Sequence, residues 1–323
     1  MVQLVAHDLA KVELAGSSPV YRSNERILID IRVLYFLYIQ TRIYDIIICG
    51  TDIRLLIIFY LKRRNKMLEV KNVTKKYGKN LACNDVSFTL DSGSLTVLLG
   101  PNGAGKSTIM KSIIGFLKYQ GTITVDGIPN KTSDARKVLG YIPEMPSLYS
   151  TLTVVEHMEF IARAYKLTNY KERIDMLLKR FELDDKRKKF GDELSKGMQQ
   201  KLNLCLGLLP DPDIILLDEP LLGLDPHAIK ELKLMIEEMR QAGKTMLIST
   251  HIIDSVDMLW DRTVIMQDGK VKANVTKAEI DGMGKSLEDL FFEVTEGISK
   301  EAVSEEKNEE ENTEEEKDNT EEA

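Results

Sequence analysis

The fold of this 323-residue chain is decided by the stretch Gly100-Pro101-Asn102-Gly103-Ala104-Gly105-Lys106-Ser107-Thr108. It fits the pattern G-x-x-x-x-G-K-[ST], a glycine-rich loop whose backbone N–H groups cradle phosphate oxygens. An apolar run at 95–99 precedes the loop, and residues 109–117 carry apolar side chains at helical spacing. The motif requires this order of strand, loop and helix; a chance glycine-rich turn before a helix is the alternative. We therefore predict a nucleotide site in which Lys106 reaches the β- and γ-phosphates and the Ser107 hydroxyl ligates Mg²⁺.

A second decisive stretch is Asp213-Ile214-Ile215-Leu216-Leu217-Asp218-Glu219-Pro220, a continuous apolar run that ends in two acidic residues. Such a run predicts a buried parallel strand, whose carboxyl end lies at the sheet edge where ligands bind. We predict that Asp218 holds Mg²⁺ and that Glu219 polarises the water that attacks the γ-phosphate. An ordinary strand end with solvated acids is the alternative, and the phosphate loop upstream disfavours it.

Composition and charge exclude several classes of protein. The length suggests about two domains, and 43% hydrophobic with 29% charged residues is ordinary for a globular protein. Residues 301–323 hold twelve acidic and two basic residues, a local charge of −10, so the other 300 residues carry +3. That remainder lacks the basic face of a nucleic-acid binder, so no nucleic-acid partner is expected. Cys49, Cys83 and Cys205 have neither metal-ligand nor redox spacing, which fits a reducing compartment.

Residues 1–66 differ in composition from the rest of the chain. Charged residues interrupt the apolar segment 27–61, so a membrane-spanning helix of roughly 18–20 apolar residues is not expected there. At Met67 the sequence changes to the alternating pattern of a half-buried strand. We predict that Met67 is the natural start and that 1–66 is a poorly structured extension or a start-site artefact. An amphipathic membrane-surface segment, based on the apolar run 55–61 and the basic run 62–66, is the alternative.

Strand and helix patterns alternate along the rest of the chain. Strands are expected at 68–73, 85–90, 95–99, 121–126, 137–142, 213–218 and 245–250, followed by a hairpin of 262–267 and 270–275. Helices are expected at 109–117, 152–167, 170–181, 226–241 and 286–294, with an all-helical insert at about 145–210. The turn Tyr77-Gly78-Lys79-Asn80 indicates a small antiparallel sheet ahead of the phosphate loop.

Two single residues and the carboxyl-terminal tail indicate a function less specifically than the two stretches above. His251 follows the strand 245–250, and this places it at the same sheet edge as Glu219. Tyr77 either stacks on a purine or is a surface tyrosine beside a turn, and its position alone favours the second interpretation. Residues 298–323 are predicted to form an acidic disordered tail, because they cannot bury enough apolar surface to offset ordering entropy. A regulatory or partner-binding tail is the alternative.

Three further motifs complete a specific set. They are Leu194-Ser195-Lys196-Gly197-Met198-Gln199-Gln200-Lys201 before the acidic strand, Leu222-Gly223-Leu224-Asp225-Pro226 after it, and Ser249-Thr250-His251 at the end of the next strand. With the phosphate loop, this order resembles the nucleotide-binding subunit of an ATP-binding cassette (ABC) transporter, over about 67–295. The resemblance implies an α/β fold: a P-loop NTPase core with a mostly parallel sheet, an antiparallel β subdomain and an inserted helical subdomain. The predicted ABC ATP-binding domain is 67–297.

The sequence departs from the family pattern at two places. Glu144 stands where the family usually has glutamine, and a carboxylate can still ligate Mg²⁺ or orient the water. The signature reads Lys196-Gly197-Met198 in place of the usual Gly-Gly-Gln, but Ser195 and Gly197, which are expected to touch the γ-phosphate, are kept. Both variations resemble exporter subunits of the ABC-2 type.

The resemblance also implies roles for individual residues. Glu219 and His251 are the expected catalytic residues, and Ser107, Glu144 and Asp218 are the expected Mg²⁺ ligands. ATP would be held by Tyr77, which stacks on adenine, and by Gly100, Pro101, Asn102, Gly103, Ala104, Gly105, Lys106, Ser107, Thr108, Glu144, Ser195, Gly197 and Asp225.

Partners follow from the same resemblance. Two ATP molecules would be sandwiched between this chain and a second ATP-binding subunit, either an identical chain or a paralogue. Each ATP would be held by the phosphate loop of one chain and by Ser195 and Gly197 of the other, with Asp225 communicating across the dimer. The helical insert would pass the motion to a separate transmembrane permease, at the cytoplasmic face of the membrane, and drive export. A soluble ABC-type ATPase with a non-transport role and a non-hydrolysing nucleotide sensor are the alternatives.

Overall fold

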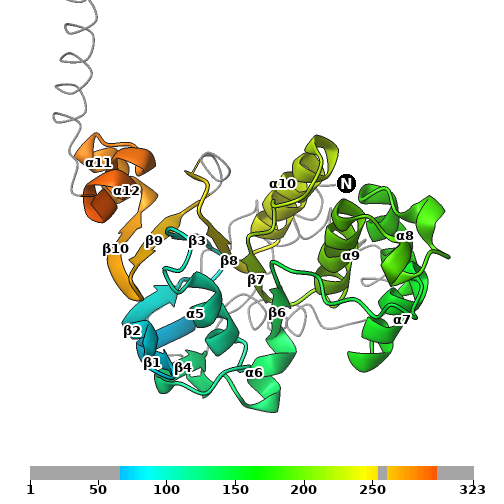
Figure 1. Ribbon diagram of the computed structural model, residues 1–323, viewed down its shortest axis with the longest axis horizontal. Coiled ribbons are helices and arrows are strands. Elements are labelled where there is room, and N and C mark those ends of the chain that lie inside the picture. Colours follow the sequence, from blue (N-terminus) through cyan, green and yellow to red (C-terminus); the bar gives the residue numbers. More distant parts are fainter. Residues whose placement is uncertain (1–65, 254–259, 297–323) are drawn as a thin grey trace, which may run out of the picture. The chain divides into compact units, whose positions relative to one another are not determined.

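The computed structural model describes residues 66–253 and 260–296. Within these residues the strands form two sheets, one of six strands and one of four (Figure 1). The predictions for residues 1–65 and for the tail from 297 onward lie outside the described residues. No helix in the described part of the chain is long and apolar enough to cross a membrane.

The six-stranded sheet carries the phosphate loop and has the order β10-β9-β3-β8-β7-β6. All neighbouring pairs are parallel except β9 with β10, so the mostly parallel sheet predicted from the sequence is confirmed. The strands are β3 (Leu95–Leu99), β6 (Leu139–Ile142), β7 (Ile214–Asp218), β8 (Thr245–Thr250), β9 (Arg262–Gln267) and β10 (Lys270–Thr276).

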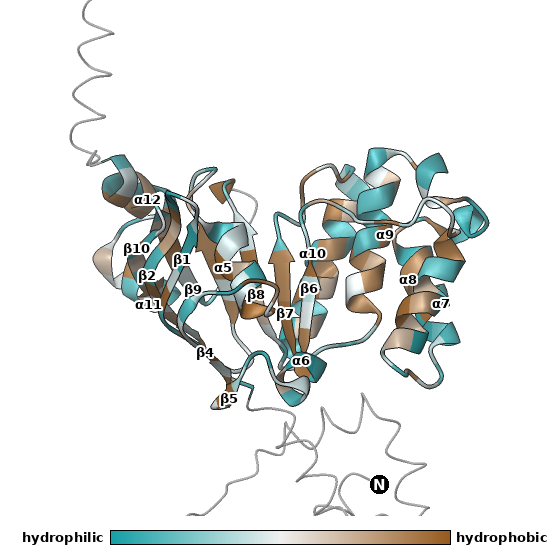
Figure 2. Cartoon of the chain, turned by 60° about the horizontal axis from the view of Figure 1, so that its bottom comes forward, coloured by the Kyte–Doolittle hydropathy of each residue, from teal (hydrophilic) through white to brown (hydrophobic). Residues whose placement is uncertain are grey.

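Both faces of the central strands β3, β7 and β8 are buried, which explains why these strands are mostly apolar runs. Successive side chains of a strand point to opposite faces. In β7, Leu216 therefore packs on the side of α5 (Lys106–Ile113), and Leu217 packs on the side of α10 (Pro226–Gln241). Figure 2 shows the hydrophobic colouring of β7 between these layers. The phosphate loop is thus held on a rigid, fully covered strand.

The second sheet is antiparallel and has the order β2-β1-β4-β5. It comprises β1 (Leu68–Tyr77), β2 (Asn80–Leu90), β4 (Gln120–Val125) and β5 (Ile128–Pro129). Gly78 has a φ of +58° in the turn between β1 and β2, a conformation that glycine adopts without steric cost. The antiparallel sheet predicted ahead of the phosphate loop is confirmed, with both strands longer than expected.

The helices of the expected insert lie together beyond β6, the last strand of the six-stranded sheet (Figure 1). They are α7 (Val154–Ala164), α8 (Lys171–Arg180) and α9 (Lys196–Leu208), with short 3₁₀ helices at Asp184–Lys186 and Gly191–Glu193. Thr153 begins α7 with a capping box: its hydroxyl accepts from the Glu156 amide, and the Glu156 carboxylate accepts from the Thr153 amide. The helices predicted at 152–167 and 170–181 are confirmed, each slightly shorter than expected.

Two expected elements have clearly different bounds and one helix was not predicted, each for an identifiable reason. Residues 137–142 do not form one strand, because the Thr132 hydroxyl caps a helix, α6 (Ser133–Val138), and only the residues from Leu139 onward are extended. The helix expected at 109–117 begins at Lys106 and ends at Ile113, shortly before Gly115 takes a φ of +84°. A further helix, α11 (Lys277–Met283), was not predicted; Thr276 and Glu279 form its capping box.

The final predicted helix is present as α12 (Leu287–Glu296). The Ser286 hydroxyl accepts a hydrogen bond from the Asp289 amide, and the Asp289 carboxylate accepts one from the Ser286 amide. Ser286 therefore caps the first turn of this helix, and the helix predicted at 286–294 is confirmed.

Candidate functional site

A cavity of about 820 Å³ lies at the carboxyl ends of the central strands, directly against the phosphate loop. The loop from Asn102 to Thr108 forms one wall of the cavity. The other side chains that the sequence predicted here and that line the cavity are Tyr77, Glu144, Glu219 and His251. Segments that are far apart in the chain thus converge on one concave surface, as expected for parallel strands that end at a common edge.

Glycines fix the path of the loop. Gly105 has a φ of +103°, and a Cβ atom there would lie 2.5 Å from the Ala82 carbonyl oxygen. A Cβ atom at Gly100 would lie 2.2 Å from the Met266 carbonyl oxygen. The backbone of the loop therefore runs so close to β2 and β9 that a side chain at either position has no room.

We expect Gly105→Ala to lower the melting temperature more than Gly103→Ala does. Both positions have positive φ, which costs an alanine roughly 1–2 kcal/mol. Only Gly105→Ala adds a clash with backbone, because nothing lies within 4 Å of the Cβ position at Gly103. Each additional kcal/mol lowers the melting temperature of a domain of this size by about 2–4 °C. Thermal unfolding without nucleotide measures the difference, and equal losses in the two variants would contradict the argument.

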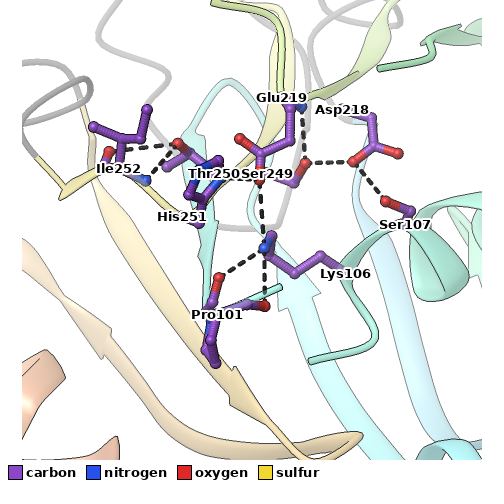
Figure 3. A network of polar contacts seen from close by, with 10 residues as sticks. Pro101, Lys106, Ser107, Asp218, Glu219, Ser249, Thr250, His251 and Ile252 are labelled. Carbon is purple, nitrogen blue, oxygen red and sulfur yellow. Dashed lines mark hydrogen bonds and ion pairs between the residues drawn. The ribbon is translucent and has the colours of Figure 1, made fainter. Parts of the chain in front are cut away.

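The Lys106 ammonium group is buried within the loop at the start of α5. It donates to the carbonyl oxygens of Gly100 and Pro101 at 2.6 and 3.2 Å, and it lies 3.4 Å from Glu219 Oε1 (Figure 3). The Gly105 N-cap makes no side-chain cap hydrogen bond. The first turn of α5 therefore offers a cation, Lys106, and backbone amides that no side chain caps. A phosphate group can accept hydrogen bonds from both.

Asp218 is the centre of a network of three hydroxyl donors. Its Oδ1 accepts hydrogen bonds from Ser107 Oγ at 3.1 Å and from Ser249 Oγ at 2.6 Å, and its Oδ2 accepts one from the Tyr141 hydroxyl at 3.1 Å. Figure 3 shows the two serine contacts. Burial and then the Asp218 charge raise the pKa of Tyr141, so this phenol stays a neutral donor at physiological pH.

Glu219 and His251 form a pair beside this network. His251 Nδ1 lies 2.9 Å from Glu219 Oε1, the same oxygen that faces Lys106 (Figure 3). The Glu219 amide donates to Ser249 Oγ at 3.1 Å, and Glu219 has a φ of +46°. A non-glycine residue with this backbone conformation is held in place by its surroundings, and such residues cluster at functional sites.

Six of the predicted site residues are not among the described residues that line the cavity. Three of them adjoin residues that do line it, since Gly100 and Pro101 accept hydrogen bonds from Lys106 and Asp218 accepts one from Ser107. The other three are Ser195, Gly197 and Asp225. Ser195 is the N-cap of α9, and its hydroxyl accepts from the Met198 amide. Asp225 is the N-cap of α10 and accepts from the Ala228 amide. Within this chain, therefore, Ser195 and Asp225 cap helices, Gly197 lies in the first turn of α9, and none of the three lines the cavity that the phosphate loop forms.

Sequence reasoning missed Ser249 and Tyr141 as site residues, although both hold Asp218. Ser249 is the direct register partner of Asp218 in the β7–β8 pair, and Tyr141 lies on β6, the strand on the other side of β7. The available signal was a polar residue near the end of an otherwise apolar strand. Such a polar residue can be assigned to the Asp218 site only when the order of the strands in the sheet is known.

The residues present fit both ATP and a magnesium ion. The cavity has an anion-binding loop on one wall and Tyr77 on another. Ser107 and Asp218 offer oxygen ligands, which are the type that Mg²⁺ prefers.

Comparisons with known proteins show the family to which the chain belongs. The sequence profile described as ABC transporter matches residues 83–222. The ABC-type transporter ATP-binding protein EcsA of Bacillus subtilis (strain 168) is 38% identical over 238 residues, which cover 71% of this chain and 96% of EcsA. This chain belongs to the family of ABC transporter ATP-binding proteins.

Other members of the ABC family are similar over the same part of the chain. The lantibiotic transport ATP-binding protein SrtF of Streptococcus pyogenes is 36% identical over 226 residues, covering 70% of this chain and 96% of SrtF. A solved ATP-binding subunit of an ABC transporter has a TM-score of 0.67 at 38% identity, covering 71% of this chain and 99% of that subunit.

A second solved structure, a dimeric ABC cassette in a post-hydrolysis state with ADP and Pi, has a TM-score of 0.59 at 28% identity. The match covers 65% of this chain and 98% of that cassette. The P-loop NTPase fold is therefore confirmed, and the chain is an ABC ATPase that binds ATP as a membrane-associated transporter component.

Proposed function

We propose that this chain hydrolyses ATP to drive export of a substrate through a separate transmembrane permease. The observation that carries the proposal is the convergence of the phosphate loop, Glu219 and His251 on one cavity, with Asp218 beneath it. Support for transport comes from the relatives, since SrtF is named a lantibiotic transport protein and a Sinorhizobium fredii relative is named for Nod factor export. The cytoplasmic face of the membrane is the proposed location.

The proposed roles follow from the contacts. Lys106 would bind the β- and γ-phosphates, and Tyr77 would stack on adenine. Ser107, Asp218 and Glu144 would hold Mg²⁺, which neutralises charge on the phosphates when bound. Glu219 would accept a proton from water as the water oxygen attacks the γ-phosphorus and the bond to ADP breaks.

His251 would have two tasks at the γ-phosphate end of the cavity. Its contact with Glu219 Oε1 would orient the carboxylate toward the attacking water. It would also contact the γ-phosphate directly.

We propose that a second cassette completes the site. Ser195, Gly197 and Asp225 do not line the cavity of their own chain, so they are available to the nucleotide of another subunit. The partner would be an identical chain or a paralogue. Dimeric cassettes among the solved relatives support this arrangement.

A group of exposed apolar residues on the helical insert would contact the permease. Met145, Tyr149 and Phe160 are exposed, and the rings of Tyr149 and Phe160 meet edge to face at 5.8 Å between centroids. Apolar side chains of this size on one surface mark interaction sites. The segment also begins next to Glu144, so movement of the site would reach the permease through a short path.

The domain boundaries belong to the same proposal. The ATP-binding domain would span 67–297 and include the helical insert at about 145–210. Residues 1–66 would form an extension and residues 298–323 an acidic tail.

Removing the Tyr141 hydroxyl is expected to raise the Mg²⁺ concentration required for half-maximal activity. Tyr141→Phe keeps the ring but deletes one of the three hydrogen bonds to Asp218, and loss of such an outer partner typically costs about 10–100-fold in metal affinity. The measurement is a Mg²⁺ titration of ATPase rate at saturating ATP. Tyr119→Phe is the matched control, since the Tyr119 hydroxyl donates to Asn130 instead. An unchanged Mg²⁺ requirement in Tyr141→Phe would count against a metal role for Asp218.

The proposed function is tested by purifying the tagged full chain from native membranes and identifying what accompanies it. We expect a polytopic membrane protein, and we expect Tyr149→Ser combined with Phe160→Ser to release it without loss of ATP binding. Recovery of ribosomes, or of no partner, would favour a soluble ATPase and overturn the transport proposal.

A further inference from the structure

Lys201 is a buried charged residue that the proposed nucleotide site does not use. It lies on α9, and only 6% of the residue is exposed. Its ammonium nitrogen lies 2.6 Å from Asp225 Oδ2 and 3.1 Å from Glu182 Oε2. A buried lysine between two carboxylates joins the elements that carry those carboxylates.

The ion pairs connect the helical insert to the core. Glu182 follows α8 in the insert, whereas Asp225 is the N-cap of α10, which packs on the central sheet. Lys201 lies within two turns of Ser195 and Gly197 on the same helix. A second close approach supports the connection, because a Cβ atom at Gly197 would lie 3.2 Å from the Gly223 carbonyl oxygen.

The two carboxylates favour the charged form of the Lys201 ammonium group. Burial by itself lowers the pKa of a lysine, but hydrogen bonds to Asp225 and Glu182 outweigh it and raise the pKa of Lys201. The hydrogen bond from Lys201 likewise holds the pKa of Asp225 below its ordinary value. His227 Nδ1 lies 3.7 Å from Glu182 Oε2, and both carboxylates of this group already have the Lys201 ammonium group as a partner.

We propose that Lys201 is a positioning residue that fixes the first turns of α9 to Asp225. Ser195, Gly197 and Asp225 are thereby held as one surface, presented together to the nucleotide of a second cassette. This inference rests on the proposed cassette dimer, but the geometry of the surface can be tested in a single chain.

The variants separate charge from packing. Lys201→Met keeps an unbranched side chain and removes the charge, while Lys201→Arg keeps the charge. Lys230→Met is the control, because Lys230 is an exposed lysine on α10 that makes no ion pair within 66–253 and 260–296. Lys201→Gln replaces Lys201→Met if a melting curve shows that the latter does not fold.

The first measurement is amide hydrogen exchange in the full-length protein. Lys201→Met is expected to speed exchange about tenfold at both 195–199 and 223–228, since both segments lose a shared anchor. Lys201→Arg and Lys230→Met are expected to match the unaltered protein. Unchanged exchange at 223–228 would overturn the proposal, because Asp225 would then be held without Lys201.

The second measurement is ATP-induced dimerisation in a Glu219→Gln background, followed by sedimentation. We expect Lys201→Met to weaken dimerisation about tenfold, with monomer affinity for a fluorescent ATP analogue unchanged. A purely structural role would leave dimerisation intact once the protein is folded, and that result would overturn the proposal. If the Glu219→Gln parent does not dimerise, the proposed dimer fails, and the exchange measurement still decides the role of Lys201.

Discussion

Glu219→Gln is expected to slow ATP hydrolysis by about 10²–10⁴-fold while ATP binding persists, because loss of a general base typically costs this much. The amide keeps the shape of the carboxylate but cannot accept a proton from water. The change also removes one negative charge 3.4 Å from Lys106, in a cavity meant for an anion. ATP affinity should therefore be unchanged or higher, and ATP-bound dimers should accumulate.

Turnover, nucleotide affinity and sedimentation in the same preparation test this expectation. Glu237→Gln is the control, since Glu237 is on α10 and does not line the cavity. His251→Ala should also slow turnover, because His251 contacts the same Glu219 oxygen at 2.9 Å. If Glu219→Gln hydrolyses ATP at the normal rate, another group is the base and our assignment of Glu219 is wrong.

Lys106→Ala is expected to weaken ATP binding by about 100-fold or more. Hydrogen bonds to charged groups contribute about 1.5–3 kcal/mol each, and an ammonium group that reaches two phosphates makes at least two. The truncation also leaves the Gly100 carbonyl without its 2.6 Å partner and Glu219 without its nearest cation. Binding of a fluorescent ATP analogue measures the loss.

Lys111→Ala is the matched control for this experiment. Lys111 lies in the last turn of the same helix, is exposed and does not line the cavity. Lys111→Ala removes the same charge from α5 as Lys106→Ala does, so a general electrostatic effect on ATP binding would appear in both variants. Equal affinities in Lys106→Ala and the unaltered protein would contradict the phosphate-site interpretation.

Much of the cavity could be predicted because parallel strands end at a common edge. The motifs around Lys106, Glu219 and His251 each follow an apolar run, and such runs predict strands without knowledge of their neighbours. Strand order is a different matter, since β3 and β7 are separated in the sheet by β8, which comes later in the chain than either. The contact of Ser249 with Asp218 depends on that order, so it could not be read from the sequence.

The errors in the fold come from helix-capping signals in the sequence that the predictions did not take into account. Val138, Leu139 and Ile142 suggest a strand, yet the Thr132 cap converts the first part of that segment to helix. The pattern Thr276-x-x-Glu279 is a capping box signature and would have indicated α11. Spacing alone does not distinguish a site within one chain from a site between two. The expectation that Ser195 and Gly197 contact the nucleotide of a second chain, and that Asp225 acts across the dimer, therefore came from the family resemblance and not from spacing.

The three hydroxyls around Asp218 leave its charge intact. Ser107, Ser249 and Tyr141 orient the carboxylate by hydrogen bonds, but none of them carries a positive charge that would neutralise it. Its neighbour Glu219, in contrast, already faces the Lys106 cation. Two adjacent acids in one strand end are thus electrically different, and a divalent cation that enters between Ser107 and Asp218 meets a full negative charge.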